Sequence, residues 1–370
     1  MQKIAIIGAS YLQQPLVEKA KDMGVFSICF AWQKDAVCAD VCDRFYPISI
    51  VEKEKILEIC QQEQVDGICT IASDVAAPTV AFVAEKMGLP GNTHQSAVKA
   101  NNKFLMREAF IKGNVPCPWY KMVTSPDGIN PSSLPYPLIV KPSDRSGSLG
   151  VEKVNNSTQL ISAINKAVAV SFKKQAMVEE YIEGREISVE FISYKGLHYP
   201  LTITDKITTE APHFVELEHH QPSTLSQKMY SSIYEITQRA LSSLGITDGA
   251  SHSEFKITAD GRIYIMEIGA RMGGDFIGSD LVRLSTGYDF LKGVIDTALG
   301  CFSVPQKTLA MHSGIYFLCE ETKRLLPYFQ EESIPFIVKK EKTGNQLNHV
   351  TCSGDRNGYL IYQSDHLVCL

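Results

Sequence analysis

The sequence lacks long apolar runs and paired cysteines. Its first apolar run, residues 4–7, stops at Gly8, and no run in the 370 residues approaches the roughly 18 apolar residues of a membrane span. The ten cysteines are scattered and none forms a C-x-x-C pair, which disfavours a zinc site and favours buried thiols over disulfides. We therefore expect a cytoplasmic protein with no signal peptide and no membrane partner.

An excess of positive charge is also missing. The chain has 36 basic and 41 acidic residues and a formal net charge of -5, which gives no support to a surface for nucleic acid. Any anionic ligand must then be held by local groups. A composition of 44% hydrophobic and 21% charged residues is typical of a soluble globular protein, and the length predicts two or three domains.

The first part of the chain alternates between apolar runs and helical patterns. Strands are predicted at residues 3–8, 26–31 and 67–71, and helices around 16–23, 56–60 and 75–87. This alternation predicts a small parallel α/β domain. The glycine spacing G-x-G-x-x-G of a dinucleotide site is absent after the first strand, so we assign no NAD site to it.

The most informative stretch, residues 251–275, reads SHSEFKITADGRIYIMEIGARMGGD. Alternating polar and apolar residues on either side of Asp260-Gly261 predict a hairpin of two strands. Glu254 and Glu267 would then lie roughly opposite one another, where their carboxylates could converge on a hard cation such as Mg²⁺. The alternative is a surface hairpin with cross-strand charges, which is the commoner use of a lone glutamate pair. The segments upstream favour the cation site.

Two lysines upstream stand at positions suited to phosphate. Lys103 is near the start of an amphipathic helix predicted over residues 101–111, and Lys141 ends a strand predicted over 136–142. Residues 143–151, SDRSGSLGV, follow at once and form a small, flexible loop whose backbone amides can wrap phosphate oxygens. Such loops are more often plain hairpin turns, but a lysine directly before this one favours phosphate binding.

A strand predicted over residues 176–182 breaks at Glu183-Gly184 and resumes over 187–193. The backbone groups exposed at such a break can bind an adenine edge, and a carboxylate just beyond it can bind both ribose hydroxyls. The alternative is a plain β-hairpin with acidic tips. Residues 206–221 are rich in acids and histidines, which favours a polar loop over a zinc site.

The remaining patterns are helical and extended. Helices are predicted over residues 227–244, where Gly245 marks the end, and over 289–299. Strands are predicted near residues 314–319, 335–340 and 358–362, in a C-terminal part that has few candidate reactive groups.

Five features stand in one order along the chain. They are Lys103, Lys141 before the Ser/Gly loop, the strand break E-E-Y-I-E-G-R-E, Glu254, and Glu267 with Arg271. Each is weak alone, but the ordered set resembles the ATP-grasp superfamily of carboxylate-amine ligases. The resemblance implies an α/β and α+β fold in which two subdomains clamp ATP. It implies a parallel α/β domain at residues 1–95, an ATP-grasp domain at 96–300 with a mobile lid at about 112–187, and a β-rich C-terminal subdomain at 301–370.

The resemblance also implies roles for individual residues. The phosphates would meet Lys103, Lys141, Ser146, Gly147, Ser148 and Gly150, and the nucleoside would meet Glu179, Glu180, Tyr181, Ile182, Met266 and, at the ribose, Glu186. Glu254 and Glu267 would hold Mg²⁺ (or Mn²⁺), and Arg271 would stabilise the charged intermediate. Residues 214–223 look like the substrate loop of the amino-acid ligase branch, which makes Glu216 and His220 candidate substrate contacts.

One position departs from the family pattern. The family usually has an asparagine metal ligand two residues after the second metal-binding glutamate, and here that residue is Gly269. The spelling E-I-G-x-R is similar to that of the amino-acid ligase branch, so we interpret the glycine as a trait of a subfamily.

The resemblance implies a ligase that joins a carboxylate, expected to be an amino acid, to an amine. ATP would activate the carboxylate as an acyl phosphate, with release of ADP and phosphate. Two alternatives stay open: a purine-biosynthesis or bicarbonate-using enzyme similar to carbamoyl-phosphate synthase, and a non-catalytic ATP sensor. The expected partners are small-molecule substrates, with no nucleic acid and no membrane, and a homodimer is left open.

Overall fold

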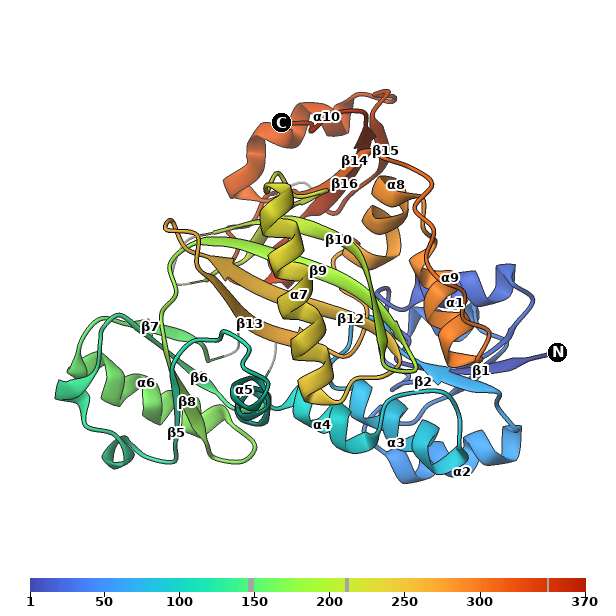
Figure 1. Cartoon of the computed structure of the whole chain (residues 1–370). Coiled ribbons are helices and arrows are strands. Elements are labelled where there is room, and N and C mark those ends of the chain that lie inside the picture. Colours follow the sequence, from blue (N-terminus) through green and yellow to red (C-terminus); the bar gives the residue numbers. More distant parts are fainter. Residues whose placement is uncertain (146–149, 210–212, 345) are drawn as a thin grey trace.

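The computed structural model describes residues 1–145, 150–209, 213–344 and 346–370. Within these residues the named strands form three sheets, one of eight strands and two of four (Figure 1). One four-stranded sheet is parallel, and the other two sheets are antiparallel. The expected combination of a parallel α/β part with antiparallel α+β parts is therefore confirmed.

The parallel sheet is formed by the first 70 residues, in the order β3-β2-β1-β4. Its strands are β1 (Lys3–Ile7), β2 (Phe26–Phe30), β3 (Arg44–Tyr46) and β4 (Gly67–Cys69). Alternate residues of β1 face opposite sides, so Ile4 and Ile6 pack on one face while Ala5 and Ile7 pack on the other. Helices α2 (Lys53–Glu63) and α3 (Ala77–Met87) cover the second face.

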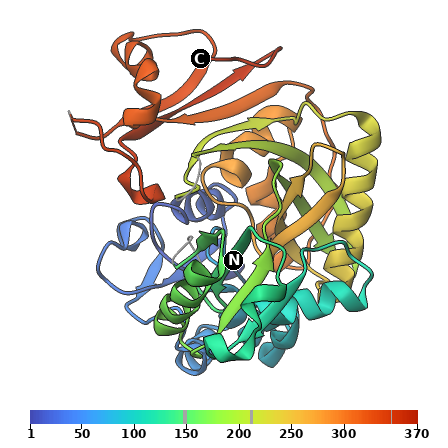
Figure 2. The ribbon, with the colours of Figure 1, turned by 90° about the vertical axis from the view of Figure 1, so that its left-hand side faces the viewer.

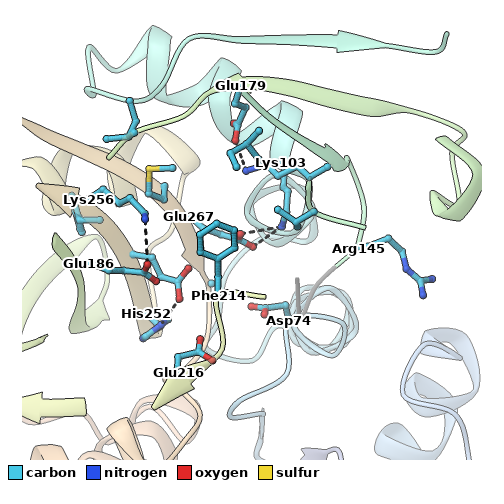
Figure 3. A pocket seen from close by; sticks show the side chains of 18 of the residues that line it. Asp74, Lys103, Arg145, Glu179, Glu186, Phe214, Glu216, His252, Lys256 and Glu267 are labelled. Atoms are coloured by element: carbon cyan, nitrogen blue, oxygen red, sulfur yellow. Dashed lines mark hydrogen bonds and ion pairs between the residues drawn. The ribbon is translucent and has the colours of Figure 1, made fainter. Parts of the chain in front are cut away.

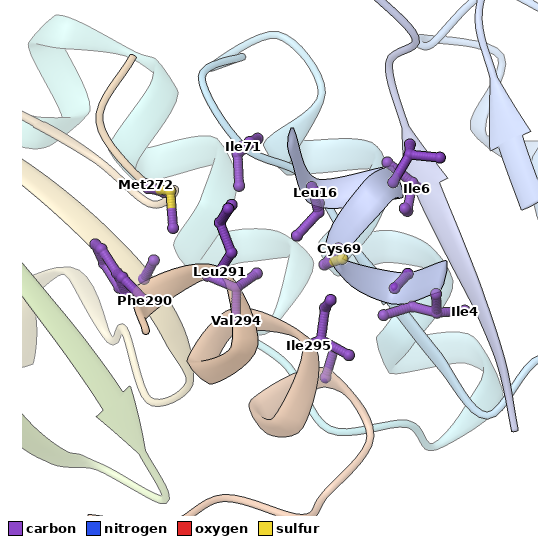
Figure 4. Close-up of a cluster of buried hydrophobic side chains, with 14 of the residues drawn as sticks. Ile4, Ile6, Leu16, Cys69, Ile71, Met272, Phe290, Leu291, Val294 and Ile295 are labelled. Atoms are coloured by element: carbon purple, nitrogen blue, oxygen red, sulfur yellow. The ribbon is translucent and has the colours of Figure 1, made fainter. Parts of the chain in front are cut away.

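The first face of this sheet is covered by helices from the two ends of the sequence. Helix α1 (Gln14–Asp22) lies beside α9 (Phe290–Ala298), with α1 packed on β2 and α9 on β4, and both helices share a buried cluster with Ile4 and Ile6 of β1 (Figure 4). Leu291, Val294 and Ile295 of α9 share one buried cluster with Leu16 and Cys69. The predicted helix at 289–299 is confirmed, but its place in the core of the N-terminal sheet was not predicted.

The second four-stranded sheet has the order β5-β8-β6-β7 and is backed by one helix. Its strands are β5 (Tyr120–Val123), β6 (Leu138–Pro142), β7 (Glu152–Val154) and β8 (Ala176–Glu180), and the helix is α6 (Ser157–Val170). Val140, Val178 and Leu160 belong to a core of their own within this unit. In β6 and β8, Ile139 pairs with Glu179, so Lys141 and Glu179 end up close to one another.

The eight-stranded sheet runs β13-β12-β9-β10-β11-β14-β16-β15. Its strands are β9 (Arg185–Tyr194), β10 (Leu197–Thr208), β11 (Glu216–Gln221), β12 (Gly249–Ile257), β13 (Ile263–Gly269), β14 (His312–Phe317), β15 (Ile337–Lys342) and β16 (Gly358–Ser364). Figure 2 shows the C-terminal strands extending this sheet at the top of the molecule. Helix α7 (Gln227–Leu244) packs across one face through Ile233, Ala240 and Leu244.

One expectation from the sequence is wrong. Residues 206–221 do not form a polar loop, because Lys206 still lies in β10 and residues 216–221 form β11, which pairs with both β10 and β14. Residues 210–212, between the two strands, lie outside the described residues. Polar side chains in this sheet are buried against partners from distant segments, which the local pattern could not indicate.

Lys103 is the first residue of a capped helix, which fixes its position. Helix α4 (His94–Asn101) ends before Asn102, whose side chain accepts a hydrogen bond from the Leu105 backbone N at 3.0 Å and so caps helix α5 (Lys103–Lys112). Two further helices, α8 (Val282–Thr286) and α10 (Leu326–Gln330), are short. Within the described residues, no helix is both long enough and apolar enough to cross a membrane.

Candidate active site

A cavity of about 290 Å³ lies where the three sheets approach one another (Figure 3). Most of the residues predicted from the sequence line it: Lys103, Lys141, Glu179, Tyr181, Ile182, Glu186, Glu216, Glu254, Met266, Glu267 and Arg271. In Figure 3, Glu179 and Lys103 lie at the upper end, Glu216 lies at the lower end, and Glu267 stands between them. The fold therefore gathers in one place residues that are far apart in the sequence.

Among the remaining predicted residues that the structure describes, Glu180, Gly150 and His220 do not line this cavity. Glu180 lies at the end of β8, where its backbone N–H donates to the Trp119 carbonyl at 2.9 Å. Gly150 lies near the end of the predicted phosphate loop. Its φ is +74°, a left-handed conformation that favours glycine. Ser146, Gly147 and Ser148 lie outside the described residues. Their assignment to a phosphate-binding loop stays a prediction.

His220 points away from the cavity because it alternates along β11 with His219, which pairs with Lys206. The register shift between Ile207 and Thr208 then brings Glu216 to the Lys206 side of the sheet, while His220 stays on the other side. There the ring of His220 hydrogen bonds to Tyr362 Oη at 2.9 Å through Nδ1 and to Glu218 Oε2 at 3.0 Å through Nε2. The structure therefore brings Glu216, but not His220, together with the other candidates.

At the upper end of the cavity, Lys141 and Glu179 form an ion pair with little solvent exposure. The Glu179 carboxylate also accepts a hydrogen bond from Arg107 Nε at 2.8 Å. Burial would raise the pKa of Glu179, but the charges of Arg107 and Lys141 outweigh it and lower the pKa. Burial lowers the pKa of Lys141, against the attraction of Glu179. Arg107 contacts one oxygen of Glu179 and Lys141 contacts the other. Because Arg107 fixes the carboxylate, Glu179 can orient Lys141.

Lys103 pairs with Glu267 in the middle of the cavity. Its Nζ lies 2.8 Å from Oε1 and 3.0 Å from Oε2 of Glu267, across 164 residues of sequence. Burial would lower the pKa of Lys103, but the charge of Glu267 outweighs it and raises the pKa. Lys103 is thus a permanent positive charge beside one of the two predicted metal ligands.

Glu254 and Glu267 are direct cross-strand partners in β12 and β13, as the hairpin pattern predicted. Both side chains reach the cavity, and each is about one third exposed. Two carboxylates provide the hard oxygen donors that suit Mg²⁺, which is usually held by one or two carboxylates together with phosphate oxygens and water. The donor set therefore fits a magnesium ion that a nucleotide brings with it.

Lys206 connects three of the candidate residues and was not among the predicted ones. Its Nζ lies 2.7 Å from Glu254, 3.5 Å from Glu186 and 3.5 Å from Glu216, and its side chain is only 3% exposed. Burial would lower the pKa of Lys206, but the carboxylates, Glu254 first, raise it. In turn, the charge of Lys206 lowers the pKa of Glu254. Lys206 therefore keeps three mutually repelling acids in one wall.

His252 and Glu190 form a buried pair behind Glu254. His252 Nδ1 is hydrogen bonded to Glu190, whose other oxygen accepts from the Gly273 backbone N at 3.1 Å. His252 Nε2 lies 3.5 Å from Glu254. Burial would lower the pKa of His252, but Glu190 outweighs it and the pKa rises to about 9. His252 is thus a cation at neutral pH. The sequence could have indicated His252 as a site residue, because the alternation in SHSEF puts His252 and Glu254 on one face of a strand.

Arg271 is held by a residue from the segment that follows the last strand of the N-terminal sheet. Its Nη2 donates to Asp74 Oδ2 at 2.8 Å, and both side chains line the cavity. Burial would lower the pKa of Arg271, but the charge of Asp74 raises it. For Asp74, burial would raise the pKa, and Arg271 lowers it. Asp74 follows β4 and stands apart from the five ordered motifs, so sequence reasoning did not find it.

Gly269 packs against this pair. A Cβ at position 269 would lie 2.6 Å from Asp74 Oδ1 and 3.0 Å from Arg271 Cζ, so a side chain there would displace both. The backbone φ of Gly269 lies outside the left-handed region, which means that space and not conformation requires the glycine. The family that the sequence resembles has an asparagine at this position. Here the space that its side chain would need is occupied by Asp74 and Arg271.

Sequence comparisons point to ligases. Residues 134–280 match the family described as ATP-grasp domain. The chain is 29% identical over 245 residues to the alanine–anticapsin ligase of Bacillus subtilis. The matched region covers 60% of this chain and 51% of that protein. The chain is 24% identical over 356 residues to the large chain of carbamoyl phosphate synthase of Thermoanaerobacter pseudethanolicus, covering 90% of this chain and 32% of that one. The chain thus spans about half the length, or less, of these relatives.

Solved structures agree over almost the whole chain. The L-amino acid ligase of Bacillus licheniformis superposes with a TM-score of 0.81 at 22% identity, covering 99% of this chain and 94% of that one. The ADP complex of an N5-carboxyaminoimidazole ribonucleotide synthetase gives a TM-score of 0.79 at 18% identity, covering 99% and 93%. At these identities the likeness establishes a shared fold.

Proposed function

We propose that this chain, which contains an ATP-grasp domain and has the ATP-grasp fold, is an ATP-dependent ligase that joins a carboxylate to an amine. The observation that carries the proposal is one cavity lined by Lys103, Lys141, Glu254, Glu267 and Arg271. Positive charge for a triphosphate, two acids for a metal ion and a fixed arginine are the groups that phosphoryl transfer to a carboxylate requires.

The upper end of the cavity suits a nucleotide. Ile139, Ile182 and Met266 supply apolar walls for a base, and Glu186 stands where a carboxylate could bind ribose hydroxyls. Lys141 and Lys103 would neutralise the phosphates, since both are buried cations held by carboxylates. Glu254 and Glu267 would hold Mg²⁺ (or Mn²⁺), which when bound neutralises negative charge on the triphosphate.

The proposed reaction has two steps. A carboxylate oxygen of the substrate attacks the γ-phosphorus of ATP, and the bond from that phosphorus to the β–γ bridging oxygen breaks, giving an acyl phosphate and ADP. The amine nitrogen then attacks the acyl carbon and loses a proton, while phosphate leaves with the electrons of the carbon–oxygen bond. Arg271 would stabilise the oxyanion formed on attack, because a guanidinium cannot lose its charge near neutral pH.

The lower end of the cavity suits an amino acid. Glu216 and Asp74 lie there with Arg271 and His252, so a substrate that carries both a carboxylate and an ammonium group would find partners for each. This mixture supports the expectation from residues 214–223. Small-molecule substrates in the cytoplasm are part of the proposal, and the association of two chains stays open.

The expected division into domains is also proposed. The sheet β5-β8-β6-β7 has its own hydrophobic core, which supports a lid at about residues 112–187 that carries Lys141 over the nucleotide. Residues 1–95 would form the first domain, although α9 completes its core from residues 290–298. Residues 301–370 would form the third, although their strands continue the central sheet.

One observation favours a different acceptor. The match to the carbamoyl phosphate synthase large chain covers 90% of this chain, against 60% for the alanine–anticapsin ligase. A bicarbonate-using or purine-pathway reaction would use the same nucleotide end and a different lower end. Such an enzyme would consume ATP with bicarbonate or a phosphoribosyl amine and not with amino acids.

The test is to incubate the protein with ATP, Mg²⁺ and single or paired amino acids, with hydroxylamine present to trap an acyl phosphate as a hydroxamate. We expect hydroxamate and ADP, and loss of both in Arg271→Gln. Arg262→Gln, at the exposed tip of the same hairpin, is the matched control and should keep both. AMP as the nucleotide product would overturn the mechanism. ADP formed only with bicarbonate or a phosphoribosyl amine would assign the other acceptor.

A further inference from the structure

Arg356 is an arginine of the C-terminal part whose guanidinium contacts two carboxylates at once. Its Nη1 donates to Asp275 Oδ2 at 2.8 Å, and its Nη2 donates to Glu216 Oε2 at 3.1 Å. The side chain is 8% exposed, and its Cζ lies 3.8 Å from the centre of the Phe317 ring. The planar guanidinium is therefore held on its face by an aromatic ring and on its edge by two acids.

Burying the Arg356 guanidinium has an energetic cost. A buried guanidinium loses its hydration, and among the described residues no acceptor lies within hydrogen-bond range of Arg356 Nε, which is itself buried. The hydrogen bonds to Glu216 and Asp275 are therefore the polar contacts that offset the burial of the Arg356 guanidinium.

One of the two acids lines the cavity, and the other lies in the segment that follows Arg271. Glu216 lines the lower end directly and also lies 3.5 Å from Lys206. Asp275 lies four residues after Arg271, in the segment where Gly273 donates its N–H to Glu190, the partner of His252. One guanidinium thus ties the start of β11 to the segment that carries Arg271.

We propose that Arg356 is a positioning residue for the substrate end of the cavity, so that residues 301–370 help to build the amino-acid site. The inference rests on the proposed ligase function and deepens it, because it assigns Arg356 to the recognition of the amino acid and not of ATP. No hydrogen bond or ion pair joins Arg356 to Lys141 or Glu179, two described residues that we place at the nucleotide end. Arg356 acts through Glu216 and Asp275, whose carboxylates it holds in fixed orientations.

The test separates the two ends of the cavity. In Arg356→Gln we expect the KM for the amino acid to rise about ten- to a hundredfold, while the KM for ATP and the affinity for ATP measured by calorimetry stay within about twofold. Arg356→Lys keeps the charge but cannot reach both acids, so it should fall between the parent and Arg356→Gln. Glu216→Gln should raise the same KM, and its effect should not add to that of Arg356→Gln.

Arg324→Gln is the matched control. Arg324 also comes from the C-terminal part and pairs with Glu218, two residues along the same strand, but Glu218 does not line the cavity. The control should leave the KM for both substrates unchanged. Equal effects of the two substitutions, or a rise in the KM for ATP with no change for the amino acid, would overturn the proposal.

A second measurement keeps the proposal testable if the parent protein turns over no amino acid. Amide hydrogen exchange of residues 214–221 and 269–276 should become faster in Arg356→Gln and not in Arg324→Gln, because only the first substitution releases both Glu216 and Asp275. Unchanged exchange in Arg356→Gln would refute the positioning role. Faster exchange without any ligase activity in the parent would refute the proposed function and leave the structural link between the two segments standing.

Discussion

Arg271 donates a hydrogen bond to Asp74 at 2.8 Å, although 197 residues separate the two in the sequence. Arg271 follows the hairpin of the central sheet, and Asp74 follows the last strand of the N-terminal sheet. The pair therefore joins two parts of the chain at the point where we place the oxyanion. Each charge supports the other, because Asp74 raises the pKa of Arg271 and Arg271 lowers that of Asp74, both against the effect of burial.

The first prediction concerns Gly269, which touches both members of this pair. The family pattern suggests that Gly269→Asn would restore a metal ligand and lower the magnesium concentration needed for half-maximal rate. The structure predicts the opposite, because a Cβ at 269 would push against Asp74 Oδ1 and Arg271 Cζ. We expect Gly269→Ala and Gly269→Asn to lower turnover by about tenfold or more. Initial rates against magnesium concentration provide the measurement.

Gly354→Ala is the control for this substitution, since among the described residues the one contact of a Cβ there is Cys352 Sγ at 3.7 Å. It should leave the rate unchanged. If Gly269→Asn instead gave a higher rate at limiting magnesium, position 269 would be a ligand position and the packing argument would be wrong.

A second prediction concerns ATP binding. Lys141→Met removes the buried charge but keeps most of the stem, and it leaves Glu179 with Arg107 as its remaining cation. Losing one charge-assisted contact to a phosphate should cost about 1.5 to 3 kcal/mol, or about 10- to 150-fold in affinity for ATP. Calorimetric titration with ATP provides the test, with Lys121→Met on an exposed position of β5 as the control. Parental affinity in Lys141→Met would refute our placement of the phosphates.

The central hairpin could be predicted from the sequence because its pairing is local. Asp260-Gly261 marks the turn, and the alternation on either side sets the register that brings Glu254 opposite Glu267. The order of the lysines and glutamates then indicated the fold and the cavity that they share. The roles of the individual residues remain predictions.

What the sequence could not indicate depends on partners far along the chain. Polar residues of β10 and β11 appeared to form a loop, yet Lys206 is buried because Glu186, Glu216 and Glu254 neutralise it from three other segments. Helix α9 was predicted as a helix, but its packing on the N-terminal sheet depends on contacts with Leu16 and Cys69. A local pattern shows that a side chain is polar or apolar, but not which distant group it will meet.

A third prediction concerns the pH dependence of stability. The folded protein raises the pKa of His252 to about 9, chiefly because Glu190 outweighs burial and the nearby charge of Arg271. The stabilising contribution of protonated His252 is therefore complete below the ordinary histidine pKa of about 6.5, and it is lost as the pH rises through 9. The difference in the free energy of unfolding between the parent and His252→Gln should shrink over this range.

Denaturant unfolding at several pH values between 6 and 9.5 measures this difference. His366→Gln provides the control, since His366 is largely exposed and the free energy of unfolding should hardly change. A difference between parent and His252→Gln that stays constant over the whole range would show that His252 does not bind its extra proton in the folded state.

The last prediction concerns the metal ion. Glu267→Gln keeps the shape of the side chain but removes one of the two negative charges that Mg²⁺ would meet, and it also frees Lys103 from its ion pair. A hard cation binds a neutral amide oxygen less tightly than a carboxylate, so turnover at a fixed magnesium concentration should fall by about a hundredfold or more. The midpoint of thermal unfolding should also fall, because the Lys103 side chain is only 12% exposed and loses its carboxylate partner. Glu235→Gln, on an exposed position of α7, is the matched control and should keep the parental rate. If Glu267→Gln had the parental rate at limiting magnesium, Glu267 would serve only to hold Lys103, and the metal would have to be held elsewhere.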